Sequence, residues 1–108
     1  MTKLPIPKEQ DIQRSILEYL WAVRIFAWKC NNSGIKKPDG GWIPSGLKGV
    51  SDILGVLKGG RFLAIEVKRL KGRATVNQQE FIDKVNRAGG LAFVATSVDE
   101  VIEKLKGE

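Results

Sequence analysis

The chain has 108 residues, enough for one domain, and its 43% hydrophobic content is ordinary for a globular protein. It has no histidine and one cysteine, Cys30, so histidine acid–base catalysis is excluded, zinc is not expected, and no internal disulfide can form. The net charge of +6 favours a polyanionic partner, most simply nucleic acid, although a basic protein without such a partner has the same composition.

Neither a membrane span nor a secretory signal is expected. No apolar run approaches the roughly 18 residues of a membrane-spanning helix, and the first five residues lack an apolar core. A lone cysteine suits a reducing compartment. The sequence therefore predicts a cytoplasmic protein.

The first half of the chain is expected to hold a helix and two strands. Apolar residues recur at helical spacing after two prolines, which predicts a helix over about 8–21. Strands are expected over 24–29 and 52–57. Between them, 31–49 is rich in Gly, Asn, Pro and Lys and is expected to form a long loop or a loose hairpin, with a short strand at 41–43.

The second half is expected to continue as strand, helix, strand and helix. Gly59-Gly60 marks a hairpin turn, Asn77 can cap the middle helix and Gly89-Gly90 ends it, and Ser97 begins a capping box with Glu100. The elements are expected over 61–68, 78–88, 91–95 and from 98. The last strand should run parallel to the first of these by a crossover. This order predicts an α/β fold, a small mixed sheet flanked by helices, as a single domain over 1–108.

The strand over 61–68 carries the feature that most needs explanation. Its centre is apolar, as in an interior strand, yet Glu66 and Lys68 stand at its end. Residues i and i+2 of a strand point to the same face, about 6.5–7 Å apart. Buried charges are costly unless they are paired or bind a metal. A carboxylate and an ammonium are therefore expected side by side at the end of an apolar strand.

The length of the preceding turn decides where Asp52 lies. A two-residue turn at Gly59-Gly60 places Asp52 opposite Val67, pointing away from Glu66. A three-residue turn that includes Lys58 places Asp52 opposite Glu66, on the same face. In the second register two carboxylates and a lysine come together, and the carboxylates repel unless they share a proton or a cation.

Such a cluster suits phosphodiester hydrolysis. In a chain without histidine a metal would have oxygen ligands, which favours Mg²⁺ or Mn²⁺. Both carboxylates would bind it, a bound water would have a lowered pKa, and Lys68 would position that water or stabilise transition-state charge. A plain ion-pair cluster at a strand end has the same spacing, so the spacing alone leaves both interpretations open.

The ordered set of residues resembles a known family. The run 49–52 (Gly-Val-Ser-Asp), then 66–68 (Glu-Val-Lys) after a hairpin, then Gln78 opening a helix, are similar to the PD-(D/E)XK nuclease superfamily and, within it, to the VRR-NUC (virus-type replication-repair nuclease) domain. The resemblance extends from Glu9 to about Val94. It implies a restriction-endonuclease-like core. The family pattern often has proline before the aspartate, where this chain has serine.

The resemblance also implies roles for single residues. Asp52 and Glu66 would be metal ligands, with the backbone carbonyl of Val67 as a third. Lys68 would be the catalytic lysine.

Two further positions follow from the family pattern. Gln78 would orient the site across from Lys68, and Glu9 would approach from the first helix as a carboxylate that binds a second metal or a water. Each also has a simpler interpretation. Gln78 can be an ordinary first-turn helix residue, and Glu9 a first-turn charge favoured by the helix dipole.

Basic residues are expected to surround this face and to contact phosphates. They are Lys36, Lys37, Lys48, Lys58, Arg61, Arg69, Lys71 and Arg73. Any one of them can instead belong to a solvated loop. Trp42 can stack on an unpaired base or cap a core or an interface, and Trp21 and Trp28 are expected in the core or an interface.

The function that follows is a metal-dependent DNA endonuclease that hydrolyses phosphodiester bonds. Stand-alone members of the family resemble junction-resolving homodimers, which implies branched DNA such as Holliday junctions, and a bacterial or phage-infected cell as the setting. The alternatives are a non-catalytic DNA-binding module of the same fold and an RNA- or nucleotide-directed hydrolase, since no pattern here reads a 2′-hydroxyl.

Overall fold

A computed structural model describes residues 5–30, 35–43 and 47–108, with only the backbone described at 35–36 and 42–43. The elements are, in chain order, α1 (Glu9–Ala22), β1 (Phe26–Lys29), β2 (Ile35–Lys36), β3 (Trp42–Ile43), β4 (Ile53–Val56), the 3₁₀ turn η1 (Lys58–Gly60), β5 (Phe62–Val67), α2 (Val76–Arg87), β6 (Leu91–Ala95) and α3 (Val98–Lys104). Among the described residues, none of the helices has the length and apolar character needed to span a membrane.

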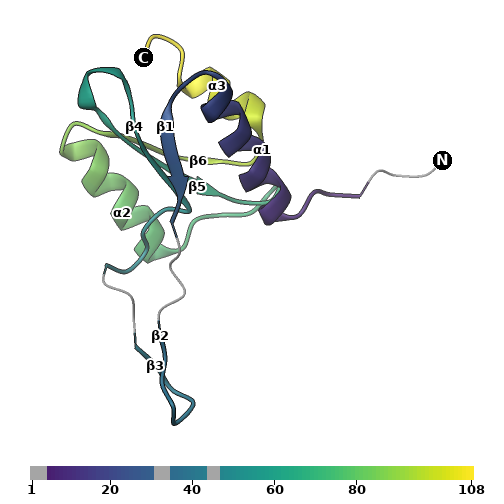
Figure 1. The fold of residues 1–108 in the computed structure, drawn as a ribbon, viewed down its shortest axis with the longest axis vertical. Coiled ribbons are helices and arrows are strands. Elements are labelled where there is room, and N and C mark those ends of the chain that lie inside the picture. Colours follow the sequence, from purple (N-terminus) through teal and green to yellow (C-terminus); the bar gives the residue numbers. More distant parts are fainter. Residues whose placement is uncertain (1–4, 31–34, 44–46) are drawn as a thin grey trace.

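The strands form one mixed sheet and one small hairpin. The four-stranded sheet has the order β1-β4-β5-β6, in which β4 is antiparallel to both neighbours and β6 is parallel to β5. The crossover from β5 to β6 contains α2. The strands β2 and β3 pair with each other as a separate antiparallel ladder (Figure 1). The mixed sheet, the parallel last strand and the loose hairpin predicted from the sequence are thereby confirmed.

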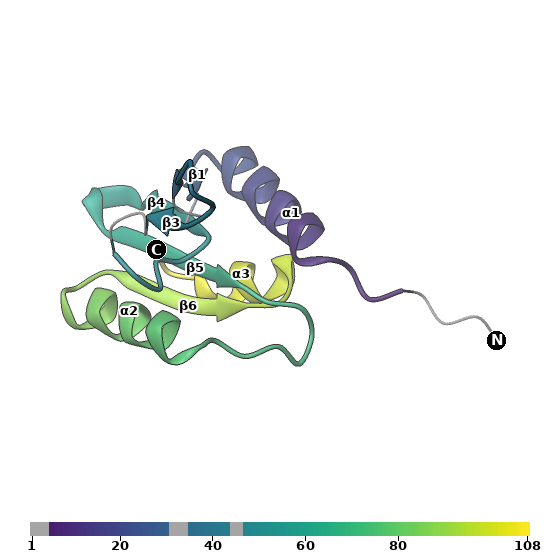
Figure 2. The ribbon, with the colours of Figure 1, turned by 90° about the horizontal axis from the view of Figure 1, so that it is seen from below.

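Helices cover both faces of the four-stranded sheet (Figure 2). Odd-numbered residues of β5, such as Leu63 and Ile65, pack with apolar residues of α1 and with Val101 of α3. Even-numbered Ala64 packs instead with Phe81 and Ile82 of α2. Because side chains alternate along a strand, Glu66 shares the α2 face with Ala64.

The hairpin register resolves the two alternatives for Asp52. Ile53 pairs with Ile65, and the ladder continues to the turn, where Leu57 N–H donates to the Arg61 carbonyl at 2.7 Å. The turn is therefore the three-residue one, and Gly59 and Gly60 adopt φ values of 84° and 87° that suit glycine. One further step of the same register places Asp52 opposite Glu66.

Two element boundaries differ from the prediction by two residues, and the others by at most one. The middle helix begins at Val76 rather than Gln78, and its N-cap is Thr75 rather than Asn77. The sequence contains the Thr-x-x-Gln spacing of this capping box, but Asn77 is also of a residue type favoured at an N-cap. The first strand begins at Phe26 rather than at Arg24, because Arg24 has a φ of 65° and closes the end of α1.

The last helix departs from the expected capping box in one bond. Ser97 Oγ accepts from the Glu100 N–H at 3.2 Å, as expected. The Glu100 side chain, however, accepts from the Thr96 N–H at 2.9 Å rather than from Ser97. The helix still begins at Val98, so the boundary is unaffected.

Candidate active site

Glu66 is a buried carboxyl group at the end of an interior strand. Its exposed fraction is 1%, and its Oε2 atom has no hydrogen-bond partner among the described residues. Leaving a buried acceptor unsatisfied costs about 1–3 kcal/mol, and more when the group is charged. The fold therefore holds a polar atom in a state that a proton or a bound cation would relieve.

Asp52 lies beside it, immediately before β4. Its Oδ2 atom accepts a hydrogen bond from the backbone N–H of Val67 at 2.8 Å. The carboxylate thus takes the backbone donor that another residue of β4 would have used, which fixes it against the end of β5. In an extended strand the N–H and C=O of one residue point to the same side. The Val67 carbonyl therefore also points toward Asp52.

The two carboxyl groups interact strongly. The pKa of Glu66 is raised from its ordinary 4.5 to about 8, first by burial, then by hydrogen bonding with Asp52 and by the negative charge of Asp52. The ammonium of Lys68 lowers the same pKa, and the charge of Glu9 raises it. The other three predicted charged residues, Asp52, Lys68 and Glu9, thus all act on Glu66.

Lys68 follows Glu66 on the same face of the strand. It is half-buried, and its backbone N–H donates to the Ala95 carbonyl of β6 at 3.0 Å, so the strand geometry continues through it. The attraction between its ammonium and Glu66 is not sufficient to cancel the effect of burial. A simple ion pair therefore does not account for the carboxyl group of Glu66.

Glu9 enters from the first residue of α1 and is half-buried. It influences Glu66 through its charge, but within the described ranges no three acidic or cysteine side chains form a group that could hold a metal ion. The side-chain oxygens that the fold brings together are those of Asp52 and Glu66. Two carboxylates, completed by a carbonyl, water or substrate phosphate, fit the ligand preferences of Mg²⁺ and Mn²⁺. Glu9 as a metal or water ligand stays a prediction.

Gln78 lies in the first turn of α2 and closes its capping box. Its Oε1 accepts from the Thr75 N–H at 2.9 Å, while its own N–H donates to Thr75 Oγ1 at 3.2 Å. The start of α2 touches the segment that leads into Asp52, because a Cβ added to Gly49 would lie 2.2 Å from the Asn77 carbonyl oxygen. Only glycine allows this approach. It brings the half-buried Gln78 to the carboxylate end of the sheet, where its role as an orienting residue stays a prediction.

The predicted phosphate-binding residues divide into two groups. Arg69, Lys71 and Arg73 are exposed and follow β5 directly, in a turn that a 2.7 Å bond from Gly72 N–H to the Arg69 carbonyl closes. Lys37 and Lys48 are also exposed. The side chains of Lys36 and Trp42 lie outside the described residues.

Lys58 and Arg61 do not surround the site. They lie before the start of β5, and Glu66 is five positions further along than Arg61, a span of about 16 Å. Arg61 is held at that end by Glu108, at 2.6 Å, and by the Gly89 carbonyl, at 3.1 Å. The prediction that these two residues belong to the basic face was wrong, because sequence proximity to a catalytic strand does not place a residue at its catalytic end.

Trp21 and Trp28, predicted to lie in the core or in an interface, are outside the core, and their place in an interface stays a prediction. Trp21 is 54% exposed and Trp28 is 37% exposed, so neither is a core residue. The Trp21 Nε1–H donates to the Ala27 carbonyl at 2.9 Å, and the Trp28 ring lies 5.0 Å from that of Phe26.

Cys30 and Ser51 flank Asp52 on adjacent strands. Cys30 N–H donates to the Asp52 carbonyl at 2.7 Å, and burial, followed by the charge of Asp52, raises the pKa of the Cys30 thiol. A thiol disfavoured as thiolate is a poor nucleophile. Ser51 is 1% exposed and its Oγ has no partner among the described residues, a feature that no local sequence pattern predicts.

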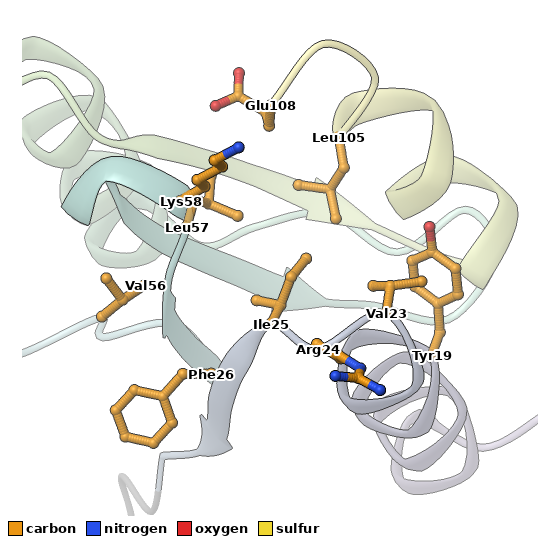
Figure 3. A pocket seen from close by; sticks show the side chains of 10 residues that line it. All are labelled: Tyr19, Val23, Arg24, Ile25, Phe26, Val56, Leu57, Lys58, Leu105 and Glu108. Atoms are coloured by element: carbon orange, nitrogen blue, oxygen red, sulfur yellow. The ribbon is translucent and has the colours of Figure 1, made fainter.

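The largest of the cavities described lies at the other end of the sheet (Figure 3). Its volume is about 700 Å³. Most of its lining is apolar, with a few polar side chains at the edge: Tyr19, Val23, Arg24, Ile25, Phe26, Val56, Leu57, Lys58, Leu105 and Glu108. Of the residues predicted for the site, Lys58 lines this cavity, but Glu9, Asp52, Glu66, Lys68 and Gln78 do not, so the chemistry proposed from the sequence is not located there.

Comparisons with known proteins bear on this geometry. A family model for the VRR-NUC domain matches residues 9–99. A solved structure described as a VRR_NUC domain protein superposes with a TM-score of 0.64 at 22% sequence identity, over 92% of this chain and 85% of that one. A search of curated proteins finds no match. The match of the family model confirms the resemblance inferred from the sequence, and the superposition confirms the α/β fold.

Proposed function

The chain belongs to the VRR-NUC family of nuclease domains, and from that premise we propose that it is a Mg²⁺- or Mn²⁺-dependent endonuclease that hydrolyses phosphodiester bonds in DNA. The observation that carries the proposal is the buried Glu66 carboxyl group, with an unpartnered oxygen among the described residues, beside Asp52. Lys68 follows on the same face, but Glu66 Oε2 still has no hydrogen-bond partner among the described residues. A divalent cation is the partner that this arrangement lacks.

Each residue of the cluster then has a part in binding or in charge stabilisation. Asp52, Glu66 and the Val67 carbonyl would hold the cation, and Glu9 would bind a second one or a water. When bound, the cation supplies a positive charge for the phosphate oxygens and lowers the pKa of a water molecule. Lys68, on the same face as Glu66, stabilises the negative charge that develops on the phosphate.

The surroundings of the cluster bind and orient the substrate. Gln78 orients the site from the start of α2. The exposed Arg69, Lys71 and Arg73 follow Lys68 directly, so they can hold phosphates next to the one that is cut. Lys37 and Lys48 are exposed and, with Lys36, are expected to contribute further phosphate contacts.

We further propose that the protein acts on branched DNA as a homodimer, which would place one active site on each of two strands. A surface for self-association lies on the part of the sheet that α2 leaves uncovered. Phe26 pairs with Val56 and Val56 with Phe62, so the three side chains form a row across adjacent strands, and their exposed fractions are 70%, 36% and 37%. An exposed apolar row of this kind often marks a protein interface.

The cleavage experiment compares a labelled four-way junction with a linear duplex of the same sequence, in Mg²⁺, in Mn²⁺ and in EDTA. Asp52→Ala tests the site, and Asp83→Ala, an exposed carboxylate on α2, is the matched control. Paired nicks in the junction alone, lost in EDTA and in Asp52→Ala, support the full proposal. Cleavage of both substrates would retain the nuclease and overturn junction selectivity, and binding without cleavage would favour a non-catalytic module.

The dimer is tested by light scattering on Phe26→Ser beside Phe81→Leu, a change in the α2 core. A dimeric parent and a monomeric Phe26→Ser variant support the proposed row. A monomeric parent protein overturns it.

A further inference from the structure

A narrow groove lies between α1 and the edge strand β1. Its volume is about 360 Å³, at the lower end of the roughly 300–1,000 Å³ typical of ligand sites. One stripe of α1 and the last residue of β1 form its walls: Gln10, Gln13, Arg14, Leu17, Trp21 and Lys29. The α1 residues recur every three or four positions, so they lie along one face of the helix over about 16 Å.

The groove opens at the catalytic end of the sheet. Gln10 directly follows Glu9, whose charge acts on Glu66. Lys29 directly precedes Cys30, whose N–H donates to the Asp52 carbonyl at 2.7 Å. A chain molecule lying in the groove would therefore lead into the carboxylate cluster.

The groove is positively charged. Arg14 and Lys29 stand on its two walls, and neither forms a salt bridge with any residue of the described ranges. None of the six residues that line the groove is acidic. Its charge therefore suits a phosphate backbone, from which released counterions would add to the affinity.

Trp21 provides a fixed aromatic surface at the far end of the groove. It is 54% exposed, yet its Nε1–H is bound to the Ala27 carbonyl at 2.9 Å, across the turn from α1 to β1. An exposed ring that is already held in place loses little further freedom when a ligand stacks on it. Nucleic acid bases stack on such rings with little regard to sequence.

Gln13 supplies the second, independent sign of a missing ligand. It lines the groove but is only 9% exposed, and its Oε1 has no hydrogen-bond partner among the described residues. An acceptor of this kind in a groove wall can be satisfied by an N–H donor of a base edge once the amide rotates.

We propose that this groove binds an unpaired DNA strand leading into the active site, with Arg14 and Lys29 on its phosphates and Trp21 stacked on a base. The proposal rests on the nuclease function above and extends its proposed substrates from fully paired junctions to branched DNA with a single-stranded segment next to the cut. A blunt duplex does not present a free base face to Trp21, so it would bind elsewhere on the basic surface.

The test measures binding of the full-length protein to a fluorescein-labelled single strand of mixed sequence and to the blunt duplex of that sequence, by anisotropy in EDTA. Trp21→Leu should weaken single-strand binding by about 5- to 100-fold and leave duplex binding unchanged. Trp21→Phe should restore most of the affinity. Trp28→Leu, whose side chain lies on the other face of β1, is the matched control and should bind both as the parent does.

Variants of Arg14, Lys29 and Gln13 test the rest of the groove lining. Arg14→Gln and Lys29→Gln should each reduce the salt dependence of single-strand binding by about 0.7 in log–log slope. Gln13→Met removes an unsatisfied buried acceptor, so it should not lower the unfolding midpoint, whereas single-strand binding should weaken.

The outcomes separate the groove from the nuclease. Single-strand binding by Trp21→Leu equal to that of the parent, or an equal loss on duplex, would overturn the groove even if the parent cuts DNA. Selective loss of single-strand binding supports the groove even if no DNA is cut under any metal condition, which would overturn the nuclease alone.

Discussion

The two ends of the four-stranded sheet treat charge in opposite ways. At the end where β5 begins, Arg61 binds Glu108 at 2.6 Å and two backbone carbonyls, and the cavity beside it is largely apolar (Figure 3). At the end where β5 finishes, Glu66 is buried with an oxygen that no described residue satisfies. At the first end the charged groups have partners within the chain, whereas at the other a buried carboxyl oxygen has none among the described residues.

This contrast supports the proposed site at the end where β5 finishes. Ionising a buried carboxyl group whose pKa is raised to about 8 by burial and by a second carboxylate costs the fold stability. The large cavity is the more obvious hollow, but it offers no such group. The unfavourable burial of the Glu66 carboxyl group beside Asp52 is therefore a better guide to the candidate site in this protein than the size of a cavity.

Lys68→Ala should have the largest effect on activity, and it tests the difference between the two ends of the sheet most directly. Removing the ammonium from the carboxylate end should reduce cleavage by about 100- to 1,000-fold or more, since its charge stabilises the transition state. Fold and metal binding should remain largely intact. The control is Lys58→Ala at the opposite end, which should cut at the parent rate, measured as single-turnover cleavage in Mg²⁺. Turnover by Lys68→Ala at the parent rate would remove its assigned role.

Gly49→Ala should have the largest effect on stability. Gly49 has a φ of 76°, and a Cβ there would lie 2.2 Å from the Asn77 carbonyl oxygen, so α2 would have to move. The expected cost is about 2–5 kcal/mol in the free energy of unfolding by urea. Gly59 at the other end has a φ of 84° with nothing within 4 Å, and Gly59→Ala should cost only about 1–2 kcal/mol. Equal costs would mean that α2 is not tightly held against the Asp52 segment.

The pH dependence of stability tests the buried carboxyl group itself. The folded pKa of Glu66 is about 8, above its ordinary 4.5, so the folded state binds the proton more tightly than the unfolded state. This contribution to stability is complete at pH values below about 4.5 and is lost as the pH rises through about 8. In EDTA, the unfolding midpoint should fall between those two values.

Glu66→Gln should flatten that dependence, because the amide does not ionise. Glu80→Gln, an exposed change on α2, should keep the parent profile. Adding Mg²⁺ at high pH should restore the midpoint of the parent protein but not that of Glu66→Gln. A parent profile that is already flat between the two pKa values would show that Glu66 does not titrate in this way.

The sequence predicted the fold well because its signals are local. Apolar periodicity gave α1, and the glycine pair Gly89-Gly90 gave the end of α2 within a few residues. The hairpin register could not be chosen in advance, because two glycines permit either turn length. It is decided by the bond from Leu57 N–H to the Arg61 carbonyl, a contact that only the folded ladder defines.

The site was predictable where its residues share a strand and not where they meet in space. Glu66 and Lys68 are two positions apart on β5, so their common face follows from the alternation of side chains. The groove beside α1 joins Arg14 to Lys29, which are on different elements, and no local pattern relates them. Arg61 was predicted near the site because it is close to Glu66 in the sequence, but it lies at the opposite end of β5.

Arg73→Ala should have the smallest effect and tests the basic turn that follows β5. One lost phosphate contact should weaken duplex binding and reduce the log–log salt slope by about 0.9, measured by anisotropy in EDTA. Arg87→Ala removes an exposed arginine at the end of α2, near the end of the sheet where β5 begins, and should leave the salt slope unchanged. If both variants lower the salt slope equally, DNA contacts both ends of the sheet. Substrate binding would then not distinguish the end that holds Glu66 from the end that holds Arg61.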